Sequence, residues 1–171
     1  MQLTFAPTEA RFAEWFFEHR QDPINQRHNP LMDQDVAALR ERLANGTSDW
    51  SKFDSVTELR WFMLNGAEVA GTVSLQNINK NMLTAEIGYG ISTSMRGQGL
   101  ATEAVRWLTS TAFAKTPLRR LVAFVHDQNV ASRRVLEKLG YKEEGLLREH
   151  FLIRGQPANE VVYGILRGEM R

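Results

Sequence analysis

The chain has no cysteine among its 171 residues. Disulfide bonds, a thiolate nucleophile and zinc sites built on cysteine are therefore excluded, and the absence is compatible with a reducing compartment. Long apolar runs are also lacking, because none approaches the roughly 18 residues that span a bilayer as a helix. The N-terminal stretch, MQLTFAPTEA, contains neither the basic nor the apolar region of a signal peptide. We therefore expect a cytoplasmic protein with no membrane partner.

An excess of charge of one sign is absent as well. The 21 basic and 20 acidic side chains leave a net charge of +1, which provides no broad basic surface for nucleic acid. The 4 histidines show no metal-ligand spacing, so we expect neither a nucleic-acid partner nor a metal. The hydrophobic content of 43% and the length of 171 residues predict one globular domain, residues 1–171, with a substantial core.

The most informative stretch is 86–104, EIGYGISTSMRGQGLATEA. Residues 85–91 are apolar or small, which is typical of a buried strand. Gly97 and Gly99 follow, and glycine allows backbone conformations that side chains restrict. From Leu100 onward the apolar residues recur with helical spacing. The pattern predicts a strand, a glycine-rich turn and a helix.

A turn of this kind can bind an anion. The first N–H groups of a helix have no partner within the helix and carry partial positive charge, and glycine lets a phosphate approach them. The segment 96–102 is therefore a candidate phosphate cradle, in which Arg96 adds charge and Thr102 adds a hydroxyl. The nucleotide P-loop pattern is absent, and Gly97–Thr102 fits the dinucleotide fingerprint poorly because its last small residue is missing.

The remaining chain predicts an α+β fold with a mixed sheet. Apolar patterning and turn residues predict strands at residues 3–6, 58–64, 67–78, 85–91, 120–126, 141–153 and 160–166. Helices are expected at residues 10–19, 34–44, 100–114 and 129–139, with Thr8, Asp33 and Asn129 as N-caps. Residues 24–32, 47–56 and 154–158 are expected to be irregular, Asn65-Gly66 to form a hairpin turn, and Gly71 to form a bulge. The strand–helix–strand unit over residues 86–126 predicts a right-handed parallel crossover.

Two motifs resemble those of a known family. Arg96-Gly97-Gln98-Gly99-Leu100-Ala101 resembles the acyl-CoA-binding motif Gln/Arg-x-x-Gly-x-Gly/Ala of the GNAT N-acetyltransferase superfamily. Asn129-x-x-Ser132, with Leu136 and Gly140-Tyr141 after it, is similar to a second motif of the family. The strand that begins at Glu86 resembles that of the RimJ/RimL-like branch, the ribosomal-protein N-terminal acetyltransferases and their relatives. The resemblance implies about seven strands and four helices, with two central parallel strands splayed around acetyl-CoA.

The resemblance also implies roles for individual residues. Those expected to contact the cosubstrate acetyl-CoA are Ile91, Ser92, Arg96, Gly97, Gln98, Gly99, Leu100, Ala101, Thr102, Asn129 and Ser132. Glu86 is the acid nearest the strand break and the candidate base for the amine, while a purely structural role weighs equally. Ser132 would lie near the cofactor sulfur and assist departure of the thiolate, although serine is also common in a first helical turn. Leu136 stands where many relatives carry a tyrosine acid, so a tyrosine at that position is excluded.

We therefore expect an N-acetyltransferase that moves acetyl from acetyl-CoA to a primary amine by direct attack in a ternary complex. The leading acceptor is an N-terminal α-amine of a protein or peptide. A small amine, such as a polyamine or an antibiotic-like molecule, is the alternative. A non-catalytic acyl-CoA-binding module is a further hypothesis. The protein is expected to be a monomer or a homodimer, with the final strands as the dimer contact.

Overall fold

The computed structural model describes residues 3–29 and 35–170. Its strands form one seven-stranded sheet in the order β1-β2-β3-β4-β5-β7-β6. They are β1 (Leu3–Pro7), β2 (Leu59–Asn65), β3 (Glu68–Asn79), β4 (Thr84–Ile91), β5 (Arg120–His126), β6 (Lys142–Ile153) and β7 (Gln156–Leu166). Neighbouring strands are antiparallel except β4 and β5, which are parallel. The predicted α+β fold with a mixed sheet is confirmed.

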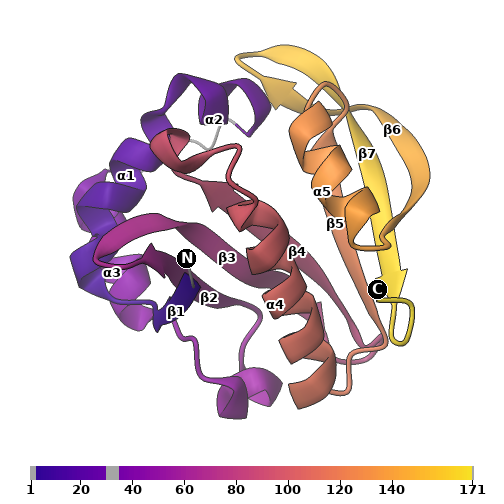
Figure 1. Ribbon diagram of the computed structural model, residues 1–171, viewed down its shortest axis with the longest axis horizontal. Coiled ribbons are helices and arrows are strands. Elements are labelled where there is room, and N and C mark those ends of the chain that lie inside the picture. Colours follow the sequence, from indigo (N-terminus) through magenta and orange to yellow (C-terminus); the bar gives the residue numbers. More distant parts are fainter. Residues whose placement is uncertain (1–2, 30–34, 171) are drawn as a thin grey trace.

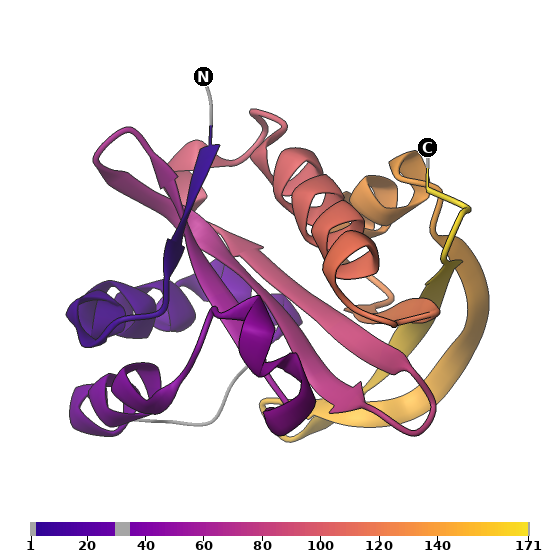
Figure 2. The ribbon, with the colours of Figure 1, turned by 90° about the horizontal axis from the view of Figure 1, so that it is seen from below.

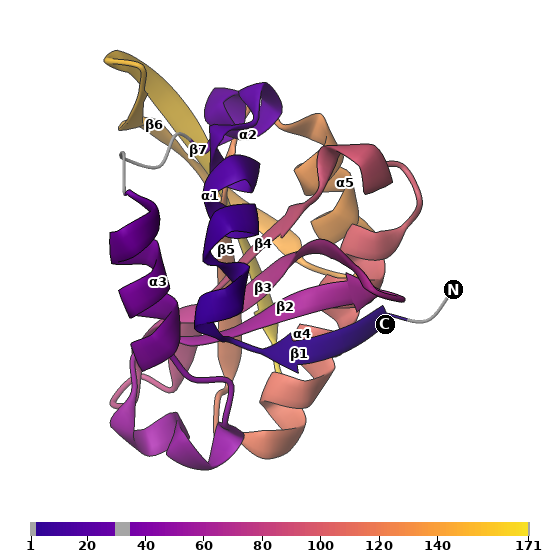
Figure 3. The same ribbon diagram turned by 90° about the vertical axis from the view of Figure 1, so that its left-hand side faces the viewer.

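Helices cover both faces of the sheet. Within the described residues they are α1 (Ala13–Gln21), α2 (Pro23–His28), α3 (Val36–Asn45), α4 (Leu100–Lys115) and α5 (Val130–Lys138), with short 3-10 helices at Ala10–Phe12, Trp50–Ser55 and Thr93–Met95. Helices α4 and α5 lie on one face, whereas α1 and α3 lie on the other (Figures 1 and 2). Seen from that second face, α1 and α3 run side by side (Figure 3). None of the helices in the described ranges is both long and apolar enough to span a membrane.

Two apolar clusters hold these layers together. The larger one joins the sheet to α4 and α5, and Leu108, Leu121 and Tyr163 are fully buried in it. The smaller one lies beneath α1 and α3, where Phe16 and Phe62 are packed. Successive strand residues point to opposite faces, so β2 supplies side chains to both clusters and the sheet is covered on both sides.

The parallel strands β4 and β5 separate part-way along their length. They pair only through Thr84–Arg120, Ala85–Leu121 and Glu86–Val122. Beyond that point β4 continues to Ile91 and β5 to His126 without pairing to each other in the described part of the chain. We call this separation the β4–β5 fork. It is the splay that the resemblance implied.

The segment after α1 differs from the prediction. Residues 24–32 were expected to be irregular, but α2 occupies Pro23–His28 and adds to the expected four helices. The Asp22 carboxylate accepts hydrogen bonds from the backbone N–H groups of Ile24 and Asn25 and so caps this helix. Proline fits the first helical turn, because its missing N–H would have no partner there. Asp22-Pro23 thus ends one helix and starts the next.

Of the three expected N-caps, Thr8 is wrong, Asp33 lies outside the residues that the structure describes, and Asn129 is confirmed. Thr8 is not a cap, because the chain enters a 3-10 turn first and Glu9 precedes that turn without a side-chain bond. Asp33 lies outside the described residues, and Asp35 caps α3 by accepting from the N–H of Ala38 at 2.7 Å. Asn129 caps α5 as predicted, since it accepts from the N–H of Ser132 at 3.2 Å.

Two further differences are local, and two local predictions are confirmed. The expected loop 47–56 contains the 3-10 helix Trp50–Ser55. Strand β7 begins at Gln156 rather than at residue 160, and its first residues pair only with β6, so the missing N–H of Pro157 removes no bond to β5. The hairpin after Asn65 forms, and the register between β2 and β3 shifts directly beside Gly71 as predicted. Here glycine is required, because a Cβ would lie 2.1 Å from the carbonyl oxygen of Gly90.

Candidate active site

Glu86 is the last residue of β4 that pairs with β5, so its carboxylate lies where the fork opens. Its Oε2 accepts a hydrogen bond from Nδ2 of Asn77 at 2.8 Å. Burial raises the pKa of this carboxyl group, the nearby charge of Glu160 raises it further, and the Asn77 bond acts in the opposite direction. A carboxylate in this setting is a better proton acceptor than one in water.

The opposite face of the fork presents a pair of hydroxyl groups. Tyr89 and Glu86 are three residues apart on β4, so they point to opposite sides of the sheet. The Tyr89 Oη lies 2.6 Å from Ser132 Oγ, in the first turn of α5, and 3.2 Å from the Ser132 carbonyl oxygen. Burial raises the pKa of Tyr89 to about 12, so its hydroxyl stays protonated at neutral pH. The Ser132 hydroxyl is thus held by a second protonated group.

The glycine-rich turn has the conformation that its sequence suggests. Gly97 and Gly99 have φ values of 76° and 81°, and nothing lies within 4 Å of a Cβ placed on either residue. Gly99 is the N-cap of α4 and offers no side-chain hydrogen bond to the helix. The first N–H groups of α4 therefore keep their hydrogen-bonding capacity at an open turn, and this donor set fits a diphosphate.

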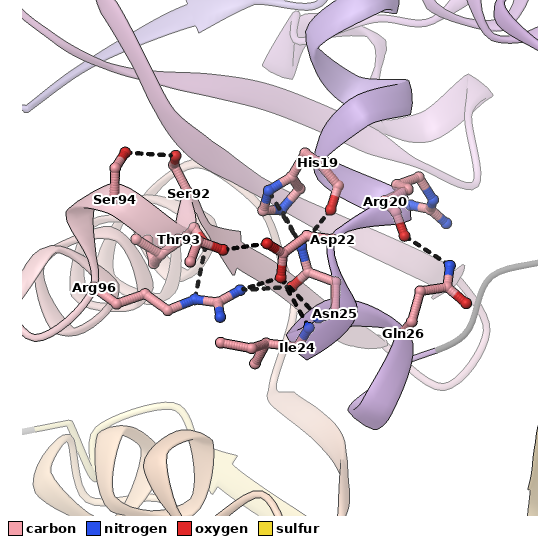
Figure 4. Close-up of polar contacts among 11 residues, drawn as sticks. His19, Arg20, Asp22, Ile24, Asn25, Gln26, Ser92, Thr93, Ser94 and Arg96 are labelled. Carbon is pink, nitrogen blue, oxygen red and sulfur yellow. Dashed lines mark hydrogen bonds and ion pairs between the residues drawn. The ribbon is translucent and has the colours of Figure 1, made fainter.

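The Arg96 side chain points toward the junction of α1 and α2 (Figure 4). Its Nη2 donates to Oδ1 of Asn25 at 3.0 Å and lies 3.6 Å from Oδ1 of Asp22. Its Nε donates to the carbonyl oxygen of Ile91 at 3.2 Å. The buried Nη1 has no hydrogen-bond partner among the described residues. Two of the three guanidinium nitrogens are thus engaged by the protein itself.

Residues 2–142 match the profile of the acetyltransferase (GNAT) domain, which is most of the chain. The chain belongs to the GNAT family of acetyltransferases. The β4–β5 fork and the open glycine turn both lie within the matched residues.

Two of the relatives of this GNAT chain are named for different acceptors. It is 40% identical over 106 residues to the probable N-acetyltransferase YjcK of Bacillus subtilis, an alignment over 61% of this chain and 59% of YjcK. It is 33% identical to the spermidine N(1)-acetyltransferase of Escherichia coli K12, over 61% of this chain and 56% of that protein. It is also 33% identical to the ribosomal-protein-serine acetyltransferase of the same strain, over 48% and 46%. These alignments span about half to three fifths of the relatives.

A solved structure of RimL, a ribosomal α-N-protein acetyltransferase in complex with coenzyme A, has the same fold. Its TM-score with this chain is 0.85 at 17% identity, and the match covers 97% of this chain and 94% of RimL. At that identity the likeness concerns the fold. It confirms that the seven-stranded sheet with a central fork is a GNAT sheet.

The side chains of Tyr141, Tyr163 and His126 each contact a polar side chain other than Ser132. Tyr141 Oη lies 2.8 Å from Thr109 Oγ1, and Tyr163 Oη donates to Glu137 at 2.8 Å. His126 ends β5, and its Nδ1 lies 3.0 Å from Nδ1 of His28 on α2. Burial, together with His126, lowers the pKa of His28. Tyr89 is thus the tyrosine beside Ser132. It was not singled out from the sequence, although strand alternation within the EIGY motif could have indicated that it lies on the sheet face opposite Glu86.

Two hollows of the described surface lie away from the fork. The first, of about 380 Å³, is lined by residues of β1, β2 and the loop 46–49. The second, of about 400 Å³, is lined mainly by residues within 42–47 and 55–60. Neither includes a residue of the fork or of the 96–102 turn. Within the described ranges, no group of three or more histidine or acidic side chains could hold a metal ion.

Proposed function

We propose that this protein transfers the acetyl group of acetyl-CoA to a primary amine, and that the acceptor is the N-terminal α-amine of a protein or peptide. One observation carries the proposal. Strands β4 and β5 part directly after Glu86 and Val122, and the gap that opens is bordered by a carboxylate of raised pKa and by the end of β4 that leads into the open glycine turn. A GNAT chain with this arrangement has the groups that acetyl transfer requires.

The open turn and the ends of β4 and α5 would hold acetyl-CoA. The backbone N–H groups of residues 97–102 would bind the diphosphate, because the glycines leave them accessible. Leu100 is buried in the core, so it contributes its backbone rather than its side chain. The residues assigned to acetyl-CoA are Ile91, Ser92, Arg96, Gly97, Gln98, Gly99, Leu100, Ala101, Thr102, Asn129 and Ser132.

Glu86 would act as the proton acceptor. When bound, acetyl-CoA supplies a thioester whose carbonyl carbon can be attacked by a neutral amine. Glu86 takes the proton that the amine loses, directly or through a water molecule. An α-amine has a pKa of about 8 and a lysine amine one of about 10.4, so the α-amine requires a weaker base. Because the pKa of Glu86 is raised, the difference between its pKa and that of the acceptor amine is smaller, and proton transfer to Glu86 becomes more favourable.

Ser132 would assist the leaving group. Its hydroxyl lies in the first turn of α5, where the helix dipole favours negative charge. As the bond between sulfur and the acetyl carbon breaks, the hydroxyl donates to the sulfur. Tyr89 Oη, at 2.6 Å, can donate to Ser132 Oγ in turn, which keeps the serine proton available. Tyr89 therefore belongs with Ser132 in the proposed machinery.

A polyamine acceptor is the alternative, and it has support of its own. One relative is named a spermidine N(1)-acetyltransferase, and the charge of Glu160 acts on Glu86 from β7. Two carboxylates on one face suit an acceptor with more than one positive charge. A non-catalytic acyl-CoA-binding module would keep the 96–102 turn and would not need the proton-transfer roles of Glu86 and Ser132.

Calorimetry with acetyl-CoA, CoA and ATP tests the proposal first. We expect micromolar binding of both CoA species and none of ATP. Acetylation of a panel of peptides with free N-termini, and of spermidine, is then followed by mass spectrometry. Faster transfer to peptides supports the α-amine acceptor, whereas faster transfer to spermidine supports the alternative. If Glu86→Gln and Ser132→Ala bind CoA and transfer acetyl as well as the parent protein, the assigned catalytic roles are wrong.

A further inference from the structure

Asp22 sets the geometry of the α1–α2 junction. Helix α1 ends at Gln21, and Pro23 starts α2 directly after Asp22. One carboxylate oxygen of Asp22, Oδ1, accepts from the N–H groups of Ile24 at 2.9 Å and Asn25 at 3.3 Å. This carboxylate therefore caps the first turn of α2 directly after the end of α1.

The same carboxylate is held by the segment that precedes the glycine turn. Thr93 Oγ1 donates to its second oxygen, Oδ2, at 2.6 Å, and the guanidinium of Arg96 lies 3.6 Å from Oδ1 (Figure 4). The Thr93 bond is the main cause of the lowered pKa of Asp22, so the group is ionised at neutral pH. Arg96 also donates to the side chain of Asn25 at 3.0 Å. We call Asp22, Asn25, Thr93 and Arg96 the loop clamp.

The loop clamp joins two segments that lie 71 positions apart in the sequence. On one side, Arg96 is adjacent to Gly97 and is also bonded to the end of β4 through Ile91. A shift in the backbone of the 96–102 turn therefore moves the base of the Arg96 side chain. On the other side, Asp22 and Asn25 belong to the α1–α2 junction and its first turn.

Helices α1 and α2 lie over the face of the fork that carries Glu86. Glu86 and Gly90 share a strand face, since alternate residues of a strand point the same way. A Cβ on Gly90 would lie 2.9 Å from Nε2 of His19, so α1 rests directly on this face. At the far end of α2, His28 contacts His126 of β5. The pair of helices thus reaches from the end of β4 to the end of β5 on the side of the candidate base.

We propose that the loop clamp couples the acetyl-CoA turn to α1–α2, so that occupation of the turn orders these helices over Glu86 and completes the acceptor side of the site. The inference rests on the proposed acetyl-CoA site. Coupling of this kind is reciprocal by thermodynamic linkage, so an acceptor that orders α1–α2 would strengthen CoA binding by the same factor by which CoA strengthens acceptor binding. Arg96 would then meet acetyl-CoA through its place at the start of the turn, while its guanidinium group, bonded to Asn25 and close to Asp22, acts as a positioning group for α2.

Hydrogen–deuterium exchange of the full-length protein with and without saturating CoA tests the coupling. In the wild-type protein we expect CoA to slow exchange about fivefold or more, both in residues 97–104 and in residues 13–28. In Thr93→Val and in Asp22→Asn, the protection of 97–104 should remain, whereas that of 13–28 should fall below about twofold. Asn is itself a good N-cap, so Asp22→Asn removes the charge but keeps the start of α2.

Two further variants separate coupling from general damage to the turn. Thr93→Ser keeps the hydroxyl that bonds Asp22 and should restore the protection of residues 13–28. Ser94→Ala removes the neighbouring hydroxyl, which lies 3.2 Å from Ser92 Oγ and belongs to no part of the loop clamp. It should behave like the wild-type protein.

The outcomes distinguish this inference from the proposed function. Protection of 97–104 without protection of 13–28 in the wild-type protein would overturn the coupling and leave the acetyl-CoA site in place. Full protection of 13–28 in both Thr93→Val and Asp22→Asn would also overturn it. An absence of protection in both segments would overturn the acetyl-CoA site, and the coupling with it.

Discussion

Tyr89 Oη and Ser132 Oγ lie 2.6 Å apart, and this contact joins β4 to the first turn of α5 across residues that are 43 positions apart. Beyond the fork, β4 and β5 no longer exchange backbone hydrogen bonds. The two hydroxyl groups therefore connect β4 to α5, the helix that follows β5, beside the place where the two strands separate.

Removing the Tyr89 hydroxyl tests its role. We expect Tyr89→Phe to lower kcat about tenfold, because Ser132 loses the donor that keeps its own proton available, with little change in the KM for acetyl-CoA. The matched control is Tyr141→Phe, which removes a buried hydroxyl bonded to Thr109 at 2.8 Å. Both variants should lose about 1 kcal/mol of stability, and only the first should lose activity. Equal kcat values in the two variants would contradict the assignment.

The pH dependence of acetyl transfer tests Glu86. We expect Glu86→Gln to lower kcat about 100-fold, since a positioned base contributes on that scale. Burial raises the pKa of Glu86, so the wild-type rate should fall as pH decreases through this raised pKa and the base becomes protonated.

Replacing Asn77 should shift the acidic limb of the rate profile in a defined direction. Its bond to the Glu86 carboxylate favours the ionised form. Without the bond the pKa rises further, and the acidic limb of the rate profile should move to higher pH. Asn77→Gly is the suitable variant, because Asn77 has a φ of 48° that glycine adopts without strain. An acidic limb that stays in place would show that Glu86 does not control the rate.

The glycine turn can be tested by comparison with a second glycine. Gly99 and Gly66 have φ values of 81° and 66°, and nothing lies within 4 Å of a Cβ on either one. Changing either residue to alanine should therefore cost a similar amount of stability, about 1–2 kcal/mol. Gly99→Ala alone should weaken CoA binding, by about tenfold or more, because its methyl group stands where the diphosphate approaches. Equal CoA affinity in the two variants by calorimetry would place the diphosphate elsewhere.

His19 makes the stability depend on pH. Burial lowers its pKa from 6.5 to about 4 in the folded protein. Between these values the unfolded chain binds more protons, so the free energy of unfolding decreases by up to about 3 kcal/mol as pH falls from 6.5 to about 4. Urea unfolding of wild type and His19→Gln at pH 7 and pH 5 should give a smaller difference for the variant. Parallel losses in both proteins would mean that other groups account for the slope.

Local chemistry accounts for what could be predicted about the fold. The alternation of 85–91, the glycines at 97 and 99 and the helical spacing from Leu100 each depend on neighbours within a few residues. The cap at Asn129 is likewise a contact over three residues. The helix α2 was missed because Asp22-Pro23 is both a stop signal and a start signal, and only the structure shows that it acts as both.

By itself, the sequence determined the order of the strands along the chain, the glycine turn that enters α4 and the resemblance to GNAT enzymes. Only the tertiary structure decided that Tyr89 meets Ser132, that Asn77 bonds Glu86 and that Arg96 is directed to the α1–α2 junction. The physical reason is the range of the interactions. Periodicity and turn chemistry act between neighbours, whereas these side-chain partners come together only after the sheet has formed and the helices have packed on its two faces.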